Sequence, residues 1–247
     1  LHLIYIYNVV RRRPTRYWKL LAVMVVLFFM VLSGCNFTLL LIAMVRSPKV
    51  LVNNEEFKDF ILIILAVSVA LALGLVLLRK MPIGSAFRSS LFSVASALTT
   101  TGFFVSDYTS WPVGMWVVLM TLMFVGACSG STSGGIKIIR QLIFSKNAVL
   151  ELRRIIHPNA VIPVKINKKS LSRSVVFKTM TFVFLYFFIL VGGVMVLLSL
   201  GVDFDTSVGA SLASLSNLGT GIGEVGPYGT YAFFPQVAKW VLMLFML

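Results

Sequence analysis

Residues 87–103 read FRSSLFSVASALTTTGF, and residues 205–221 read DTSVGASLASLSNLGTG. Each stretch is a weakly polar helix candidate that ends in a glycine turn led by Thr or Asn, and the two turns lie about 117 residues apart. A helix of about 12 residues is about 18 Å long, roughly half of a bilayer core. Lipid tolerates non-helical backbone only where protein buries it or where it lines water. The repeat therefore predicts two re-entrant segments whose carbonyl oxygens face a pore.

The composition indicates a membrane protein. Its residues are 58% hydrophobic and 12% charged, and the mean hydropathy is +0.95, whereas an ordinary soluble domain has roughly 25% charged residues. We therefore predict an all-α polytopic membrane protein built of repeated helix–pore-loop–helix units. The first of its apolar stretches is interrupted by polar residues at 33–36. The stretches long enough to approach or cross a core of about 30 Å are residues 20–45, 60–78, 111–128, 180–200 and 231–247.

Basic residues are concentrated in one connecting segment. Ten of the 22 Lys and Arg residues fall between Lys137 and Lys178, and Glu151 is the single acid there. Such an excess is typical of cytoplasmic loops, so both half-length helices are predicted to enter from the outside. The same alternation puts Arg11–Arg13 outside, against this rule. The acids near the glycine turns would then lie at an outer pore mouth and concentrate cations; they are Asp107, Asp203, Asp205 and Glu224.

The two glycine turns carry the candidate ion-binding residues. Glycine permits the positive φ angles that let successive carbonyls point one way, and a preceding Thr or Asn adds a further oxygen. Hard oxygen ligands suit alkali cations, and rings of carbonyls can replace a hydration shell. The candidate selectivity filter consists of Thr100, Thr101, Gly102, Phe103, Asn217, Leu218, Gly219 and Thr220.

A glycine-rich hexapeptide follows the apolar stretch 111–128 almost directly. Each glycine costs a helix up to about 1 kcal/mol relative to alanine, so we predict an unwound intramembrane segment whose hydroxyls satisfy the freed backbone groups. A nucleotide phosphate loop is the rival interpretation, but it needs Lys where Ile136 stands and a strand before the loop. The members of the hexapeptide are Gly130, Ser131, Thr132, Ser133, Gly134 and Gly135.

These segments closely resemble one protein family. Residues 100–103 (TTGF), 126–137 (GACSGSTSGGIK), 153–158 (RRIIHP) and 217–219 (NLG) resemble the Trk/Ktr/HKT potassium transporters, especially the branch of the TrkH-like membrane subunits. Members of this family have four membrane–pore-loop–membrane repeats around one pseudo-fourfold pore. By this resemblance the chain is expected to be a fragment, truncated at both ends.

The resemblance also implies a division of the chain. Residues 1–58 would be the last helix of a preceding repeat with a cytoplasmic loop, and residues 59–145 would be the third repeat. Residues 146–178 would be a basic cytoplasmic loop, and residues 179–247 would be most of the fourth repeat.

The function that the resemblance implies is K⁺ uptake through the filter, with the loop at 130–135 acting as a gate beneath it. No cofactor is implied, since K⁺ is the substrate. The implied location is the inner (plasma) membrane with multiple passes, and the implied partners are a second copy, lipid and cytosolic nucleotide-binding regulatory subunits, without nucleic acid. Compared with the channel motif Thr-Val-Gly-Tyr-Gly, the third repeat has Phe104 in place of the last glycine. The implied K⁺ ligands are Thr100, Thr101, Asn217 and Leu218.

Two other function classes remain to be weighed. A Na⁺- or H⁺-coupled symporter would bind its substrate at broken helices, and its usual marker is an ionisable residue within a span. Among the apolar stretches only the last has one, Lys239. A membrane enzyme would need a catalytic set, yet His2 and His157 are isolated and no metal-ligand cluster or carboxylate pair is visible. We therefore expect a transporter rather than an enzyme.

Overall fold

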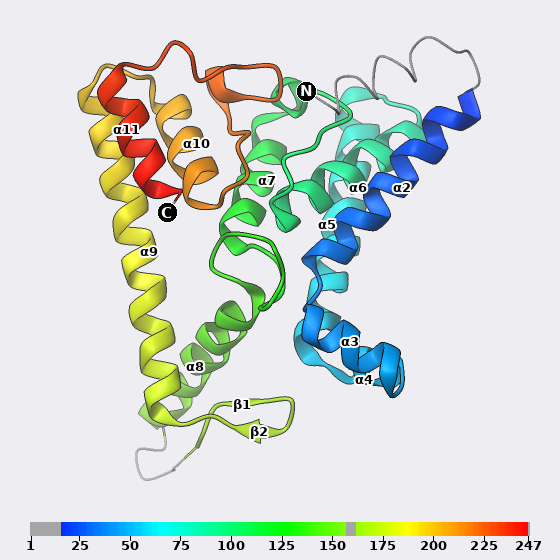
Figure 1. Ribbon diagram of the computed structural model, residues 1–247, viewed down its shortest axis with the longest axis vertical. Helices are drawn as coiled ribbons and strands as arrows, with labels where there is room; N and C mark the ends of the chain where they lie inside the picture. Colours follow the sequence, from blue (N-terminus) through cyan, green and yellow to red (C-terminus); the bar gives the residue numbers. More distant parts are fainter. Residues whose placement is uncertain (1–15, 157–161, 247) are drawn as a thin grey trace.

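The computed structural model describes residues 16–156 and 162–246, and this part of the chain is helical apart from loops and one small hairpin (Figure 1). Arg11–Arg13, His2, His157 and Leu247 lie outside the described residues. The elements, of which η1 and η2 are 3₁₀ turns, are α2 (Arg16–Gly34), α3 (Phe37–Val45), α4 (Lys49–Asn53), α5 (Glu55–Arg79), α6 (Ile83–Thr99), η1 (Tyr108–Ser110), α7 (Val113–Val125), α8 (Ile138–Ile156), β1 (Lys165–Ile166), β2 (Lys169–Ser170), α9 (Arg173–Ser199), α10 (Phe204–Leu215), η2 (Gly223–Val225) and α11 (Gln236–Phe245).

Two helices are long and apolar enough to cross a membrane, α5 with 25 residues and α9 with 27. Helices α2 and α3 pass the same test as a pair, but they bend by 99° at their junction. That junction falls at the polar residues 33–36, where the sequence predicts an interruption. The apolar helices α7 and α11 are shorter, with 13 and 10 residues. The predicted all-α membrane architecture is confirmed.

Backbone contacts with the glycine-rich loop satisfy the groups that the bend between α2 and α3 frees. The amide of Cys128 donates to the Gly34 carbonyl at 3.1 Å, and the amide of Phe37 donates to the Gly130 carbonyl at 3.2 Å. The side chain of Asn36 caps α3 by accepting a hydrogen bond from a first-turn amide at 3.1 Å. Because a bilayer core offers no water to these groups, such internal pairing is what allows a bend at that depth.

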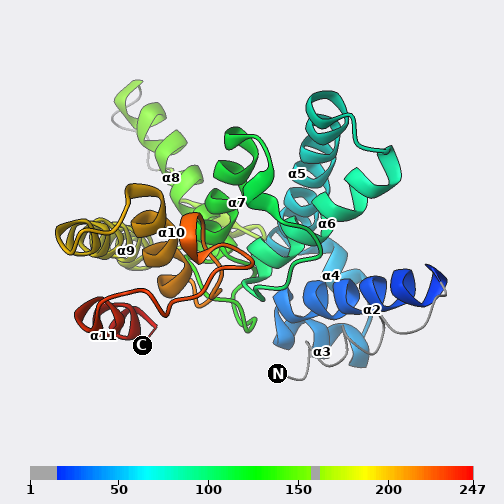
Figure 2. The ribbon, with the colours of Figure 1, turned by 90° about the horizontal axis from the view of Figure 1, so that it is seen from above.

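The helices form two units with the same order (Figure 2). In the first, α6 packs against α5 and α7, and in the second, α10 packs against α9 and α11; α7 also contacts α10 and so joins the units. Residues 92–99 of α6 and 209–214 of α10 are all buried. Many of them are Ser or Ala, which allow helices to approach closely. Both short helices are therefore enclosed, as the sequence predicts, although α6 begins earlier than expected, at Ile83.

The basic segment after the glycine-rich loop is a helix and a hairpin. Helix α8 continues to Ile156, so residues 146–156 of the predicted basic cytoplasmic loop are helical. The many Lys and Arg residues obscure the helical pattern of this stretch, in which two isoleucines are buried against neighbouring helices. Strands β1 and β2 pair antiparallel, with Ile166 opposite Lys169.

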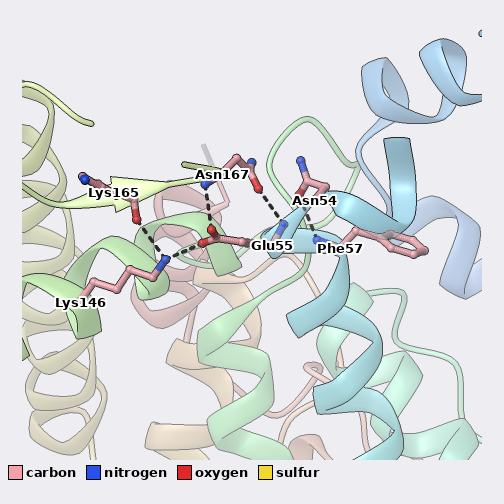
Figure 3. A network of polar contacts seen from close by, with 6 residues as sticks. All are labelled: Asn54, Glu55, Phe57, Lys146, Lys165 and Asn167. Atoms are coloured by element: carbon pink, nitrogen blue, oxygen red, sulfur yellow. Dashed lines mark hydrogen bonds and ion pairs between the residues drawn. The ribbon is translucent and has the colours of Figure 1, made fainter. Parts of the chain in front are cut away.

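A polar network ties this hairpin to α5 and α8 (Figure 3). The Glu55 carboxylate accepts hydrogen bonds from the Lys146 ammonium at 2.5 Å and from the Asn167 amide at 3.0 Å. The Asn167 side chain in turn accepts from the Glu55 amide at 2.8 Å, and Lys146 also donates to the Lys165 carbonyl at 3.0 Å. An ion pair this exposed contributes little stability by itself. Its evident role is to fix the first turn of α5 against α8 and the hairpin.

Candidate ion-conduction site

The two glycine turns share one backbone geometry. Helix α6 is followed by Thr100 at φ +50° and Gly102 at φ +71°, and helix α10 is followed by Asn217 at φ +54° and Gly219 at φ +86°. Residues other than glycine adopt this left-handed region rarely and at a cost of roughly 1–2 kcal/mol. The spacing of two residues between the strained residue and the glycine is the same in both turns. The internal repeat of the sequence is therefore also a repeat of conformation.

Hydrogen bonds close the two helices in matching ways. The amide of Thr101 donates to the Ser96 carbonyl at 3.1 Å, and the amide of Leu218 donates to the Ala213 carbonyl at 2.9 Å. Each bond spans five residues backward, a closure typical of helix ends followed by a left-handed residue. Each short helix thus directs its following turn in the same manner.

The turns, far apart in the sequence, lie in contact. A Cβ atom built on Gly102 would come closer to the Leu218 carbonyl oxygen than Cβ atoms come to other atoms in real proteins, and it would lie 4.0 Å from the Thr220 hydroxyl. Leu218 is buried, whereas Gly102 and Gly219 are partly buried. The structure therefore brings the two predicted filter segments together at the level of their backbones.

The aromatic residues after the first turn point into protein. Phe103 packs against a buried cluster that contains Met30 and Phe92, and the Phe104 ring lies 5.5 Å from the Tyr228 ring in an edge-on arrangement. These contacts anchor the chain that leaves the first turn.

The polar side chains of the turns already have protein partners. The Thr100 hydroxyl accepts a hydrogen bond from the Gly134 amide at 2.8 Å, and the Thr101 hydroxyl lies 3.2 Å from that of Thr99. The Asn217 side-chain amide donates to the Met246 carbonyl at 3.4 Å. The extra oxygen expected from Thr100 is thus engaged by the glycine-rich loop in this structure.

The glycine-rich loop lies against the ends of both short helices. It runs from Gly126 to Lys137, so the unwinding begins earlier than the predicted Gly130. Besides the bond from Gly134 to Thr100, a Cβ atom on Gly134 would lie 2.6 Å from the Ser216 carbonyl carbon and closer still to its oxygen. Only a residue without a Cβ fits between the loop and α10. The loop therefore lies in contact with the first residue after each of the two helices.

Lys137 and the loop hydroxyls satisfy the unwound backbone. The Lys137 ammonium donates to the Ser133 carbonyl, to the Ser133 hydroxyl at 3.1 Å and to the Ser131 carbonyl at 3.4 Å. The Ser133 hydroxyl accepts from the Ala127 amide at 3.2 Å, and Thr132 is the exposed member of the three. The prediction that serine oxygens serve the freed backbone is confirmed.

A carboxylate that sequence reasoning missed holds the start of this loop. Glu56 is only 5% exposed, and its two oxygens accept from the Ser129 amide at 2.5 Å and from the Ser129 hydroxyl at 3.1 Å. The available signal was an acid at the beginning of a long apolar helix, but its partner lies 73 residues away.

A tyrosine after the first turn is the second missed residue. Tyr108 is buried, and its hydroxyl donates to the Gly221 carbonyl at 2.8 Å. Burial raises the pKa of Tyr108 to about 12. A tyrosine hydroxyl is protonated at neutral pH even at its ordinary pKa of about 10, so it is a donor here. No pattern in the sequence marks this residue.

The four acids predicted at the pore mouth differ in their surroundings. Asp107 accepts from the Thr109 amide at 3.0 Å and from the Thr109 hydroxyl at 2.5 Å, so it fixes the 3₁₀ turn η1. Asp203, Asp205 and Glu224 are exposed on segments next to α10 and η2. The charges of these three face solvent, whereas the Asp107 carboxylate stabilises η1 through its hydrogen bonds with Thr109.

Known proteins match nearly all of this chain. A family model described as TrkH, cation transport protein, matches residues 16–247. The chain is 35% identical over 230 residues to the Trk system potassium uptake protein TrkH of Vibrio parahaemolyticus, which covers 91% of this chain and 47% of that protein. It is 33% identical over 220 residues to the Trk system potassium uptake protein TrkI of Halomonas elongata, which covers 89% of this chain and 44% of that protein.

A solved structure agrees with these relatives. The crystal structure of the potassium transporter TrkH from Vibrio parahaemolyticus matches with a TM-score of 0.84 at 33% identity, over 91% of this chain and 48% of that one. The chain spans about half the length of the relatives it matches. With the family model matched over residues 16–247, the chain belongs to the TrkH family of cation transport proteins.

Proposed function

We propose that the protein containing this chain takes up K⁺ across the cell membrane through a filter of backbone carbonyls. The observation that carries the proposal is the contact between two glycine turns of matching geometry at Gly102 and Leu218. Relatives over nearly the whole chain are named potassium uptake proteins. Rings of carbonyls can replace the hydration shell of K⁺, and two such turns would form part of one ring system.

In this proposal the ion follows the line along which the two turns meet. The carbonyl ends of α6 and α10 carry the negative ends of their helix dipoles, which favour a cation. The chain supplies two turns, and the other sides of the pore would come from the rest of a full-length protein. The proposed K⁺ ligands are the main-chain oxygens of Thr100, Thr101, Asn217 and Leu218.

The glycine-rich loop is the proposed gate. It contacts Thr100 and Ser216 through Gly134, so it lies against the ends of α6 and α10, which would face the pore in this proposal. Glu56 of α5 holds the loop at Ser129, and Lys137, the last residue of the loop, binds back to Ser133. We infer that permeation requires residues 130–135 of the loop to leave this position, which breaks the hydrogen bond from the Gly134 amide to the Thr100 hydroxyl.

Glu56→Gln should weaken the attachment of the glycine-rich loop to α5. A neutral amide offers one oxygen where the carboxylate offers two, so one donor of Ser129 loses its partner, at a cost of about 1–3 kcal/mol to the closed position. We expect basal ⁸⁶Rb⁺ flux through the full-length protein in proteoliposomes to rise several-fold, with the K⁺/Na⁺ permeability ratio unchanged.

The matched control is Glu55→Gln, which alters the neighbouring carboxylate that faces Lys146 and Asn167 instead of the loop. It should leave basal flux near that of the unaltered protein. Equal fluxes in the two variants would show that Glu56 does not hold a closed gate.

The function itself is tested by ⁸⁶Rb⁺ uptake by the full-length protein in a host that lacks its own potassium uptake. Uptake should appear, K⁺ should compete with it, and Na⁺ should compete weakly. Dependence of uptake on a Na⁺ or H⁺ gradient would favour the coupled symporter. In the described part of the chain the ionisable residue of the last apolar stretch, Lys239, donates to the Ala232 carbonyl at 3.0 Å, which offers no support for a coupling role. Absence of uptake by protein inserted in the membrane would reject the proposal.

The proposal extends to location and partners. The protein would reside in the inner membrane as a multi-pass subunit and form a homodimer. Cytosolic nucleotide-binding subunits would bind at the basic end, where α8 and the hairpin present their charges. Helix α8 also exposes apolar side chains there, among them Leu152 and Ile155, and a solvated basic helix of this kind suits a protein partner.

A further inference from the structure

Gly221 lies at the end of the second glycine turn, where both its backbone groups are hydrogen-bonded and its Cα is closely packed. Its amide donates to the Val225 carbonyl at 2.8 Å, and its carbonyl accepts from the Tyr108 hydroxyl at 2.8 Å. A Cβ atom there would lie 2.6 Å from the Gly209 carbonyl oxygen of α10 and 2.9 Å from a Val225 methyl group. The turn thus packs against helix α10, and the Tyr108 hydroxyl donates the hydrogen bond that ties Gly221 to the other unit.

The segment that carries this hydroxyl is itself rigid. Asp107 accepts two hydrogen bonds from Thr109, and the Trp111 amide donates to the Tyr108 carbonyl at 3.1 Å. Trp111 is buried, and the Thr109 methyl group lies 2.8 Å from where a Cβ on Gly226 would be. The backbone of Tyr108 is therefore held in place, and the hydrogen bond from its hydroxyl fixes the Gly221 carbonyl of the second unit relative to the first unit.

Little space remains behind the turns. The cavity lined by Ser93, Ser96, Phe103, Tyr108, Leu218 and Thr220, together with three apolar side chains, has a volume of about 10 Å³. That is near the least volume that holds one water molecule. Neither turn can retreat far into this space, and the hydrogen bond from Tyr108 holds the Gly221 carbonyl against movement away from Tyr108.

We propose that Tyr108 is a positioning residue for ion discrimination: its hydroxyl fixes the second filter turn relative to the first and keeps the turns from closing around a smaller cation. This inference rests on the proposed K⁺ filter. A carbonyl ring that cannot contract solvates Na⁺ poorly, because the oxygens stay at a distance that suits K⁺. Freed from Tyr108, the Gly221 carbonyl and its turn could shift toward the smaller ion.

Tyr108→Phe removes the hydroxyl and leaves the ring in place. We expect the Na⁺/K⁺ permeability ratio of the full-length protein to rise about fivefold, the factor that one net hydrogen bond represents, with thermal stability in detergent nearly unchanged. The measurement is the ratio of ²²Na⁺ to ⁸⁶Rb⁺ flux in proteoliposomes. A merely structural role would lower stability or total flux without moving this ratio.

The matched control is Tyr231→Phe. Within the described residues its hydroxyl is also buried but has no hydrogen-bond partner, so its removal should leave the ratio unchanged. As a rescue, p-aminophenylalanine at position 108 restores an N–H donor at the same place and should return the ratio toward that of the unaltered protein. If Tyr108→Phe does not fold, the rescue variant still tests the idea, since an unselective rescued protein would contradict it.

The outcomes separate the two proposals. If the unaltered protein does not favour K⁺, or does not transport it, the proposed function fails. If the unaltered protein is selective and Tyr108→Phe has the same ratio as Tyr231→Phe, the positioning role of Tyr108 is wrong while the filter stands.

Discussion

Gly102→Ser should lower the K⁺/Na⁺ permeability ratio of the full-length protein about tenfold or more, and it should lower K⁺ flux as well. Two physical costs combine at this position. The φ of +71° strains any residue with a Cβ by roughly 1–2 kcal/mol, and that Cβ would press on the Leu218 carbonyl oxygen of the other turn. Because this oxygen belongs to the backbone, it cannot move aside without displacing the second turn. Reversal potentials under K⁺ and Na⁺ gradients measure the effect.

Substitutions of two further glycines provide comparisons for this result. Gly219→Ser has the same kind of strain, at φ +86°, but a Cβ there would meet nothing within 4 Å, so its effect should be smaller than that of Gly102→Ser. Gly84→Ser in α6 has neither strain nor a close neighbour and should leave selectivity unchanged. If Gly102→Ser matches Gly84→Ser, the contact between the turns does not set selectivity.

Gly134→Ala should hold the gate open. Its Cβ would collide with the Ser216 carbonyl, and overpacking of this kind typically costs about 1–3 kcal/mol. That cost falls on the closed position alone, so the equilibrium should shift toward the open state by about tenfold. We expect basal ⁸⁶Rb⁺ flux in proteoliposomes to rise by that factor, while the K⁺/Na⁺ ratio stays near its original value.

The control for this prediction is Gly114→Ala in α7, where a Cβ meets nothing within 4 Å. It should leave both flux and selectivity unchanged. A loss of selectivity in Gly134→Ala without a rise in flux would mean that the loop supports the filter and does not close the pore.

The local part of the fold could be predicted from the sequence. Each glycine turn directly follows a weakly polar helix and contains residues in the left-handed region. Both features depend only on residues that are neighbours in the sequence. The apolar stretches now in α5 and α9 were identified for the same reason. The helical structure of α8 was not predicted, because the excess of Lys and Arg indicates on which side of the membrane a segment lies and not its secondary structure.

The contacts that connect distant segments could not be predicted. Glu56 meets Ser129 across 73 residues, and Tyr108 meets Gly221 across 113. Each of these pairs depends on how whole helices pack, which no local pattern encodes. The early start of the unwinding at Gly126, with φ +72°, likewise depends on the close approach of Gly134, whose carbonyl oxygen a Cβ on Gly126 would strike.

The central claim is that the two glycine turns hold one K⁺ path between them. Its most direct test is the anomalous scattering of Rb⁺ in crystals of the full-length protein grown with Rb⁺ in place of K⁺. The account predicts Rb⁺ peaks on the line where the turns of Gly102 and Gly219 meet, within bonding distance of their carbonyl oxygens. Rb⁺ bound elsewhere in a protein that transports it, with no peak at the turns, would contradict the account.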